Sequence, residues 1–401
     1  MNAMTQKLLT QHVIDPEICI RCNTCEESCP LGAVIHNDDN YVVQADICNR
    51  CMKCIDPCPT GAINNWRYVT TAYSTADQFS WTELPLQEKF PETDPIEAPV
   101  EALQSGGSAP ILEAPNQTSI KPIAPPSASR PVVNLHKRTK PVKAKVISNV
   151  RLTAADLEND IHHIVVDFGE TPFPILEGQS VGIVLPGTDR EGRRHAVRQY
   201  SIASPRNGER EGQNALALTV KRMPDGVCSN YLCDLGEGDW VDVTGPFGVT
   251  FLLPEDPAAN IIMICTGTGV APFRGFIKRR IRAMPASVGQ LVLLFGAQRP
   301  EALPYFDSLQ RLPPQLVTQH LCYSRLPDKP REYVQDRILA EGARLTGLMR
   351  GPTTHIYVCG LKGMETGVND ALGEACRRAG IEWPALRDEM RGSGRYHVET
   401  Y

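Results

Sequence analysis

The chain has no long hydrophobic run. Nowhere in its 401 residues does the sequence approach the roughly 20 consecutive apolar residues that a helix needs to cross a bilayer. Residues 1–12 also lack the apolar core of a secretory signal peptide. We therefore expect a cytoplasmic protein that has no membrane partner.

Concentrated basic segments are absent as well. The formal net charge is -5, from 41 Lys and Arg against 46 Asp and Glu. Proteins that track nucleic acid phosphates usually carry a basic patch or stripe, so nucleic acid is not expected as a partner. The sequence also shows no haem-attachment motif and no cluster of carboxylates and histidines suited to a di-iron centre. We therefore expect no oxygenase active site in this chain.

Cysteine, by contrast, is plentiful, and most of it is gathered near the start. Eight of the 14 cysteines lie between residues 19 and 58, in two runs that nearly repeat each other, CIRCNTCEESCP and CNRCMKCIDPCP. Such a repeat indicates an internal duplication. In a reducing compartment, metal or redox ligation is a better interpretation of these cysteines than disulfide bonding.

The spacing of the two runs predicts two 4Fe–4S clusters. Each run has the form C-x-x-C-x-x-C-x-x-x-C-P, in which the first three cysteines hold one cluster and the fourth reaches the other. Zinc needs four ligands per site and does not explain two such runs, each with Pro after the last cysteine. The expected ligands are Cys19, Cys22, Cys25 and Cys58 for the first cluster, and Cys48, Cys51, Cys54 and Cys29 for the second. The segment resembles bacterial two-cluster ferredoxins.

Composition divides the chain into four parts. Residues 1–70 are expected to form a small α+β ferredoxin domain. Residues 71–141 are rich in Pro, Ala and Ser, which predicts a disordered linker, although an ordered arm on the next domain is an alternative near 142–150. Short alternating runs over 142–256 predict an antiparallel β-barrel, which the motifs and the resemblance given below assign to FAD. Buried-type runs alternating with helical stretches over 257–401 predict an α/β parallel-sheet domain, which they assign to NADP(H).

Two short motifs in the predicted barrel suit a flavin. R-Q-Y-S occupies 198–201, and G-V-C-S-N occupies 226–230. A flavin needs a cation and backbone amides for its pyrophosphate, an aromatic neighbour for its ring and a hydroxyl near N5. An arginine beside a tyrosine on a strand is commonly a surface pair. The order and spacing of the two motifs favour the flavin interpretation.

From residue 142 onward the chain resembles the plant-type ferredoxin–NADP reductase family. The resemblance implies that Arg198 and Ser229 bind the FAD pyrophosphate, that Tyr200 packs on the isoalloxazine, and that Lys221 lies near the adenosine. It also implies that Ser201 bonds near N5 and assists hydride transfer. The implied FAD-binding residues are Arg198, Tyr200, Ser201, Lys221, Gly226, Val227, Cys228, Ser229, Thr268 and Tyr401.

The chain's last residue, Tyr401, matches the terminal aromatic residue of this family. A terminal tyrosine is usually frayed, but the resemblance implies that it stacks on the flavin and swings aside for the nicotinamide. Glu399 would then lie beside the reacting ring. In the family, the cysteine of a motif like C-G-L-K-G-M at 359–364 touches the nicotinamide. The implied catalytic residues are Ser201, Cys359, Glu399 and Tyr401.

A glycine-rich turn and a basic loop predict the nicotinamide nucleotide site. C-T-G-T-G-V-A-P at 265–272 follows a buried run and opens a helix, whose N-terminus favours a pyrophosphate. The turn departs from the usual G-x-G-x-x-G fingerprint. The 2′-phosphate of NADP calls for Arg or Lys with hydroxyl donors, although a solvated charged loop is the alternative. The implied NADP residues are Gly267, Thr268, Gly269, Ser324, Arg325, Arg331, Tyr333, Gln335, Gly360 and Leu361.

The order of the parts indicates what the whole chain does. A two-cluster ferredoxin, a Pro-rich linker and a plant-type reductase in one chain resemble the reductase components of benzoyl-CoA 2,3-epoxidase systems. The resemblance implies NADPH as electron donor and a separate di-iron oxygenase (epoxidase) subunit as electron acceptor. A general ferredoxin–NADP reductase and a non-catalytic redox sensor remain alternatives. The sequence leaves open whether the protein is a homodimer.

Overall fold

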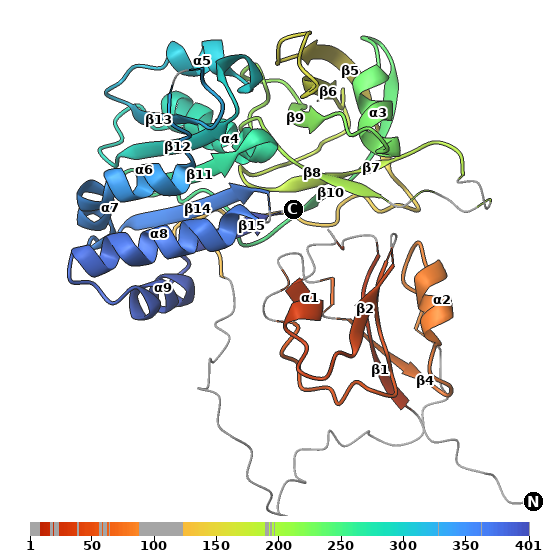
Figure 1. Ribbon diagram of the computed structural model, residues 1–401. Coiled ribbons are helices and arrows are strands. Elements are labelled where there is room, and N and C mark those ends of the chain that lie inside the picture. The colour runs from red at the N-terminus through yellow and green to blue at the C-terminus, as the bar shows by residue number, and fades with distance from the viewer. Residues whose placement is uncertain are drawn as a thin grey trace, which may run out of the picture.

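The computed structural model contains three units that follow one another along the chain (Figure 1). It describes residues 9–16, 19, 24–37, 40–55, 58, 62–63, 65–87, 123–188, 192, 195, 197–327, 329–361 and 363–400. Two predicted site residues, Cys22 and Tyr401, lie outside the described residues, as does the middle of the predicted linker, 88–122. In the described part of the chain, no helix is long and apolar enough to span a membrane.

The N-terminal unit, which comprises the described residues of 9–87, is a small α+β domain. Its elements are β1 (Leu9–Val13), α1 (Thr24–Glu27), β2 (Val34–His36), β3 (Tyr41–Val43), β4 (Asn65–Val69) and α2 (Thr75–Ser80). Strand β1 pairs antiparallel with β4, and β2 pairs antiparallel with β3. Val34, Val43 and Ile63 form a core that also contains the side chains of Cys25 and Cys54. The cysteine runs therefore lie against the interior of this unit.

Both ends of the predicted linker have structure, in contrast to the expectation of a disordered segment over 71–141. Helix α2 begins with a capping box, in which Ser74 and Asp77 bond each other's backbone amides, each at 3.1 Å. At the other end, His136 and Gly245 exchange two backbone hydrogen bonds, so residues near 136 lie along the barrel. Composition alone did not reveal these local contacts.

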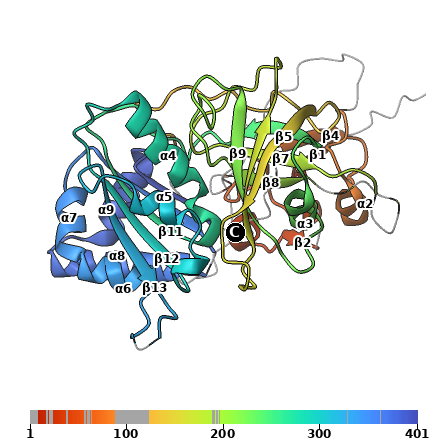
Figure 2. The ribbon, with the colours of Figure 1, turned by 90° about the horizontal axis from the view of Figure 1, so that it is seen from above.

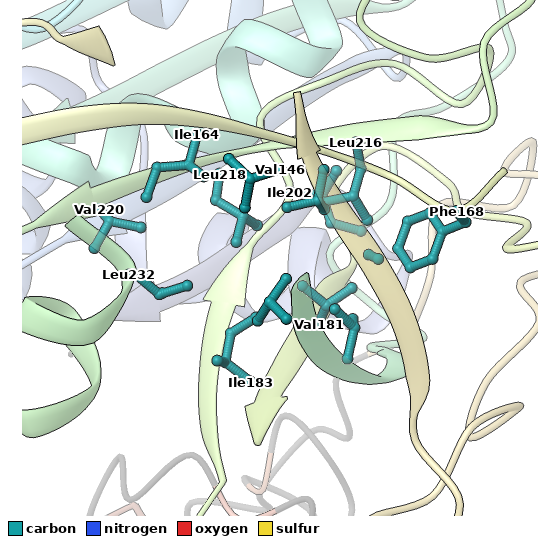
Figure 3. Close-up of a cluster of buried hydrophobic side chains, with 14 of the residues drawn as sticks. Val146, Ile164, Phe168, Val181, Ile183, Ile202, Leu216, Leu218, Val220 and Leu232 are labelled. Carbon is teal, nitrogen blue, oxygen red and sulfur yellow. The ribbon is translucent and has the colours of Figure 1, made fainter. Parts of the chain in front are cut away.

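The middle unit is a closed antiparallel barrel. Its strands are β5 (Val142–Arg151), β6 (Ile161–Asp167), β7 (Ser180–Val184), β8 (Arg198–Ser201), β9 (Ala215–Lys221) and β10 (Trp240–Phe247). They run in the order β8-β7-β10-β5-β6-β9, and an isolated bridge from Ile202 to Leu218 joins the two edges. Figure 3 shows Ile183, Ile202 and Leu218 pointing into a common core. Helix α3 (Val227–Asp234) packs Leu232 against the same core.

The C-terminal unit is a doubly wound α/β domain. Its strands are β11 (Asn260–Thr266), β12 (Leu291–Ala297), β13 (Val317–Tyr323), β14 (Thr354–Gly360) and β15 (Tyr396–Thr400). They pair in parallel in the order β13-β12-β11-β14-β15. The sheet order therefore reverses between β11 and β14. Ligands of such sheets bind beyond the carboxyl ends of the strands, at this point of reversal.

Helices cover both faces of this sheet (Figure 2). They are α4 (Val270–Ala283), α5 (Phe306–Gln310), α6 (Val334–Ala340), α7 (Gly342–Met349), α8 (Met364–Arg378) and α9 (Trp383–Gly392), with 3-10 turns η1 (Gly267–Gly269) and η2 (Pro300–Ala302). Phe273 and Phe276 of α4 pack on one face of the sheet, and Leu372 of α8 packs on the other. Both faces are buried, which explains the nearly continuous apolar runs of the strands.

A half-buried ion-pair cluster joins the barrel to the C-terminal unit. Glu209, in the barrel loop before β9, accepts hydrogen bonds from Arg274 at 2.6 and 2.7 Å, and it also pairs with Lys278. Burial alone would raise the pKa of Glu209, but its hydrogen bonds to these two cations lower it to about 2. The hydroxyls of Tyr305 and Thr219 bond at 2.6 Å nearby. These contacts hold the carboxyl ends of the parallel strands toward the barrel.

Candidate active site

A cavity of about 1370 Å³ lies where the three units meet. The carboxyl ends of the parallel strands supply one side of it, and strand β8 with the first turn of helix α3 supplies another. The predicted flavin, nucleotide and catalytic residues that line it are Arg198, Tyr200, Ser201, Lys221, Gly226, Val227, Cys228, Ser229, Gly267, Thr268, Ser324, Tyr333, Gln335, Cys359, Leu361 and Glu399. One cavity thus brings together the flavin motifs and most of the nucleotide motifs.

Four predicted residues lie near the cavity without lining it. Gly269 and Gly360 are buried behind it, while Arg325 and Arg331 are exposed beside it. The backbone amide of Arg325 donates to the carbonyl of Gln298 at 2.8 Å, and Gln298 lines the cavity. Ser324 and Glu332, the neighbours of Arg325 and Arg331 in sequence, also line the cavity, so the two arginines lie close to its rim.

The Arg198 side chain is suited to bind an anion. Its Nη1 atom is buried and has no hydrogen-bond partner among the described residues. Arg198 as a whole is half-buried, but a buried guanidinium nitrogen without a partner is costly, so the geometry fits a ligand that carries negative charge. Tyr200, two residues along the same strand, packs against the barrel core, and burial raises its pKa far above the ordinary value. Its phenol therefore stays neutral and suits stacking on an aromatic ring.

The first turn of α3 faces the cavity beside Arg198. Gly226 precedes the helix, and a Cβ atom there would lie 2.5 Å from Ser229 Oγ, so the tight turn requires glycine. Ser229 Oγ accepts from the Met223 amide at 3.1 Å and donates to the Gly226 carbonyl at 3.0 Å. The hydroxyl thus shapes the turn as well as lining the site. A helix N-terminus beside an arginine fits the pyrophosphate of FAD.

The glycine turn after β11 lies at the point where the sheet order reverses. Gly267 has φ of +55°, in the left-handed region that favours glycine. A Cβ atom on Gly269 would lie 2.2 Å from the carbonyl oxygen of Cys359, so only glycine permits this approach. Helix α4 begins at Val270 directly after the turn. This arrangement fits the pyrophosphate of a dinucleotide, as the motif predicts.

Cys359 and Glu399 form the wall next to this turn. They are direct partners in the pairing of β14 with β15, and both line the cavity. Burial raises the pKa of Glu399 to about 8. Burial, with the neighbouring Glu399 carboxyl, raises the pKa of Cys359 well above its usual range. Next along β15, Thr400 Oγ1 bonds to Glu365 at 3.2 Å, which anchors the strand just before Tyr401.

A separate cavity in the N-terminal unit is lined by four cysteines, Cys29, Cys48, Cys51 and Cys54. These are the ligands expected for the second cluster, including the one contributed by the first run. The Cys29 sulfur accepts a hydrogen bond from the Ala33 amide at 3.2 Å, as a ligating thiolate would. Burial, together with the other three cysteines, raises the pKa of Cys54 to about 12. Iron would offset this cost of gathering thiolates, so the residues fit a cluster.

Sequence reasoning missed that the N-terminal unit closes the large cavity. The lining residues from this unit are Cys19, Asn40, Phe79, Ser80, Trp81 and Thr82. Phe79–Thr82 belong to a segment assigned to the linker by composition, so no local signal connected them with a site. His195 and Gln298 also line the cavity and lie outside the recognised motifs.

Three family profiles match successive parts of the chain. A 4Fe-4S dicluster domain matches residues 18–63, an oxidoreductase FAD-binding domain matches 145–251, and an oxidoreductase NAD-binding domain matches 263–370. The matches follow the predicted order of units. They confirm the fold class and the predicted cofactors, namely FAD, NADP(H) and 4Fe–4S clusters.

Curated relatives and solved structures point to one family. The ferredoxin–NADP reductase of Synechocystis sp. is 35% identical over 332 residues, covering 78% of this chain and 80% of the relative. That of Spirulina sp. is 37% identical over 288 residues, covering 67% and 98%. The ferredoxin–NADP+ reductase structure from Plasmodium falciparum shares the fold, with a TM-score of 0.55 at 24% identity over 67% of this chain and 99% of that one. The chain is an oxidoreductase that belongs to the ferredoxin–NADP reductase family and carries an N-terminal 4Fe–4S ferredoxin domain.

Proposed function

We propose that this protein is an NADPH-dependent iron–sulfur flavoprotein reductase that serves a separate di-iron oxygenase. The observation that supports this electron path most strongly is that one large cavity is lined by the flavin motif, the nucleotide motif and the cluster ligand Cys19. When bound, FAD takes a hydride from NADPH and releases its two electrons singly, which suits one-electron 4Fe–4S clusters. The chain's own residues bind, orient and shield these groups.

The barrel unit binds FAD in this proposal. Arg198 and the N-terminal turn of α3 hold the pyrophosphate, Tyr200 packs on the isoalloxazine, and Lys221 lies toward the adenosine. Ser201 follows Tyr200 at the end of β8 and lines the cavity, where its hydroxyl would lie near N5. The remaining FAD contacts come from Gly226, Val227, Cys228 and Thr268, and Tyr401, which lies outside the described residues, is assigned to stacking on the flavin.

The nicotinamide nucleotide is held by the C-terminal unit. Gly267–Gly269 and the start of α4 bind its pyrophosphate, and Gly360 and Leu361 border it. Cys359 and Glu399 place the nicotinamide against the flavin, so orientation supplies most of the catalysis. Below pH about 8, Glu399 is protonated and can donate a hydrogen bond to the nicotinamide amide. The contacts proposed for the 2′-phosphate are Ser324, Arg325, Arg331, Tyr333 and Gln335.

The N-terminal unit receives the electrons. Cys19, Cys22, Cys25 and Cys58 hold the first cluster, and Cys48, Cys51, Cys54 and Cys29 hold the second. Such clusters and NADPH are typical of a reducing compartment, so a cytoplasmic location belongs to this proposal.

The acceptor that we propose is the di-iron epoxidase subunit of a benzoyl-CoA 2,3-epoxidase system. The support is the fusion of a two-cluster ferredoxin to a reductase, together with the lack of any oxygenase motif in the sequence. NADPH consumption should be followed with purified, cluster-loaded protein and a candidate epoxidase subunit, with and without benzoyl-CoA. Product that appears only with benzoyl-CoA, coupled to NADPH loss, supports this acceptor. Reduction of artificial acceptors without such coupling leaves a general ferredoxin–NADP reductase.

A further inference from the structure

We infer that Arg138 seats the N-terminal unit on the barrel so that the first cluster faces the flavin cavity. This inference deepens the proposed function, and its meaning for electron transfer rests on that function. Figure 1 shows the N-terminal unit below strands β8 and β10, on the side where the chain ends. Arg138 follows His136, which is paired with Gly245 of the barrel.

The Arg138 side chain joins the two units directly. Its Nη1 donates to the carbonyl of Thr82 in the N-terminal unit at 2.5 Å. Its Nη2 donates to the carbonyl of His195, just before β8, at 2.9 Å. The side chain is only 6% exposed, so these charge-assisted bonds are shielded from water. The planar fork of a guanidinium can bridge two such carbonyls, whereas the single ammonium of lysine cannot match that geometry.

The barrel side of this contact is rigid. His136 and Gly245 exchange backbone hydrogen bonds of 2.9 and 2.8 Å, which fixes the residues before Arg138 to β10. Lys137 and Lys140 close a turn around it with a backbone bond of 2.9 Å. Arg138 is thus presented from a fixed turn of the barrel unit.

On the other side of the contact, the residues next to Thr82 are held in place by hydrogen bonds within the N-terminal unit. Asn40 Nδ2 donates to the carbonyls of Phe79 and Trp81 at 3.0 and 2.7 Å, next to Thr82. Gln78, buried in α2, both donates to and accepts from the backbone of Val43 in β3. A bond to Thr82 therefore positions the whole unit and not a loose tail.

This seat sets the orientation of the two cysteine sets. Cys19 of the first set lines the flavin cavity with Trp81 and Thr82. The cavity of the second set is a separate one, and it reaches the surface at Cys51 and Met52, which are exposed. The first cluster is therefore the one that takes electrons from the flavin, and the second lies nearer to solvent. A hydride brings two electrons, one for each cluster, and its proton would pass from the flavin to solvent, so no further reductant is required.

The test compares Arg138→Ala with Lys140→Ala, an exposed position in the same turn, in the full-length protein loaded with FAD and clusters. Small-angle scattering reports how far the units separate, and stopped-flow absorbance reports flavin and cluster reduction by NADPH. We expect Arg138→Ala to increase the radius of gyration and to slow cluster reduction by about tenfold or more, with flavin reduction unchanged. Lys140→Ala should match the wild type. If Arg138→Ala does not fold, Arg138→Lys provides the same comparison.

Two results distinguish a failure of the Arg138 inference from a failure of the proposed electron path. Unchanged scattering and unchanged cluster reduction in the Arg138 variants would overturn the inference and leave the proposed function intact. If the variants expand while NADPH reduces no cluster even in the wild type, the seat is supported and the proposed electron path is wrong.

Discussion

Cys359 and Glu399 are direct neighbours on the parallel strands β14 and β15, and both side chains reach the cavity. Burial raises the pKa of Glu399 to about 8, and the pKa of Cys359 is raised well above its usual range. Both groups are therefore uncharged at neutral pH. The end of the cavity that we assign to the nicotinamide carries a neutral acid beside a neutral thiol.

The first prediction concerns Glu399 and pH. The pKa in the folded protein is about 8, above the ordinary 4.5, so the favourable contribution of the protonated acid is complete below pH 4.5. It is lost as the pH rises through about 8. The melting temperature of the wild type should therefore fall more than that of Glu399→Gln between about pH 5 and about pH 9. If the melting temperatures of the two proteins fell equally between these pH values, the result would contradict a raised pKa for Glu399.

Removing the Arg198 side chain should weaken FAD binding. The buried Nη1 atom of Arg198 has no partner among the described residues, and we assign it to the pyrophosphate. The Arg198→Gln variant should bind FAD about 10- to 100-fold more weakly, the usual cost of a lost charged hydrogen bond. Titration of apoprotein with FAD measures this. The matched control is Lys143→Gln, which removes an exposed cation on β5 of the same barrel. Equal losses in the two variants would argue against a specific role for Arg198.

Local sequence patterns were sufficient for the barrel and the parallel sheet. The runs HHIVVDF and ALALTVKRM form most of β6 and β9. Six consecutive residues of β9 are buried, so this strand is found without the strict alternation expected from the sequence. The run IIMICTG became β11, followed directly by its glycine turn. The flavin and nucleotide motifs were likewise found as short segments, and most of their residues line one cavity. The roles assigned to these residues stay predictions.

The seat of the N-terminal unit could not be predicted in this way. Arg138 reaches the carbonyls of Thr82 and His195, and a backbone carbonyl leaves no mark in a sequence. Both ends of the predicted linker looked alike by composition, although Ser74 and Asp77 form a capping box in one of them. Long-range contacts between such segments depend on the packing of whole units, which residue patterns do not encode.

Specificity for NADPH should depend on Arg325. This side chain is exposed at the rim, beyond the carboxyl end of β13, where a 2′-phosphate would lie in our proposal. The Arg325→Ala variant should raise the KM for NADPH by about tenfold or more and leave the KM for NADH nearly unchanged. Steady-state kinetics with an artificial acceptor provides both values. Equal losses for the two nucleotides would defeat the assignment.

The crossed ligand sets predict an unusual result for Cys29. Although Cys29 belongs to the first run, it lines the cavity with Cys48, Cys51 and Cys54. Cys29→Ala should therefore remove the second cluster and roughly halve the iron content. Cys25→Ala should remove the first cluster instead. Electron paramagnetic resonance of the reduced variants distinguishes the cluster that remains. If both variants retain the same cluster, the crossed assignment is wrong.

The most direct test of the central claim is anaerobic mixing of NADPH with the full-length protein loaded with FAD and clusters, followed by rapid spectroscopy. We expect the flavin absorbance to fall first and the cluster absorbance to fall next within the same molecule, at a rate independent of protein concentration. Cluster reduction that precedes flavin reduction, or flavin reduction without any cluster reduction, would contradict it.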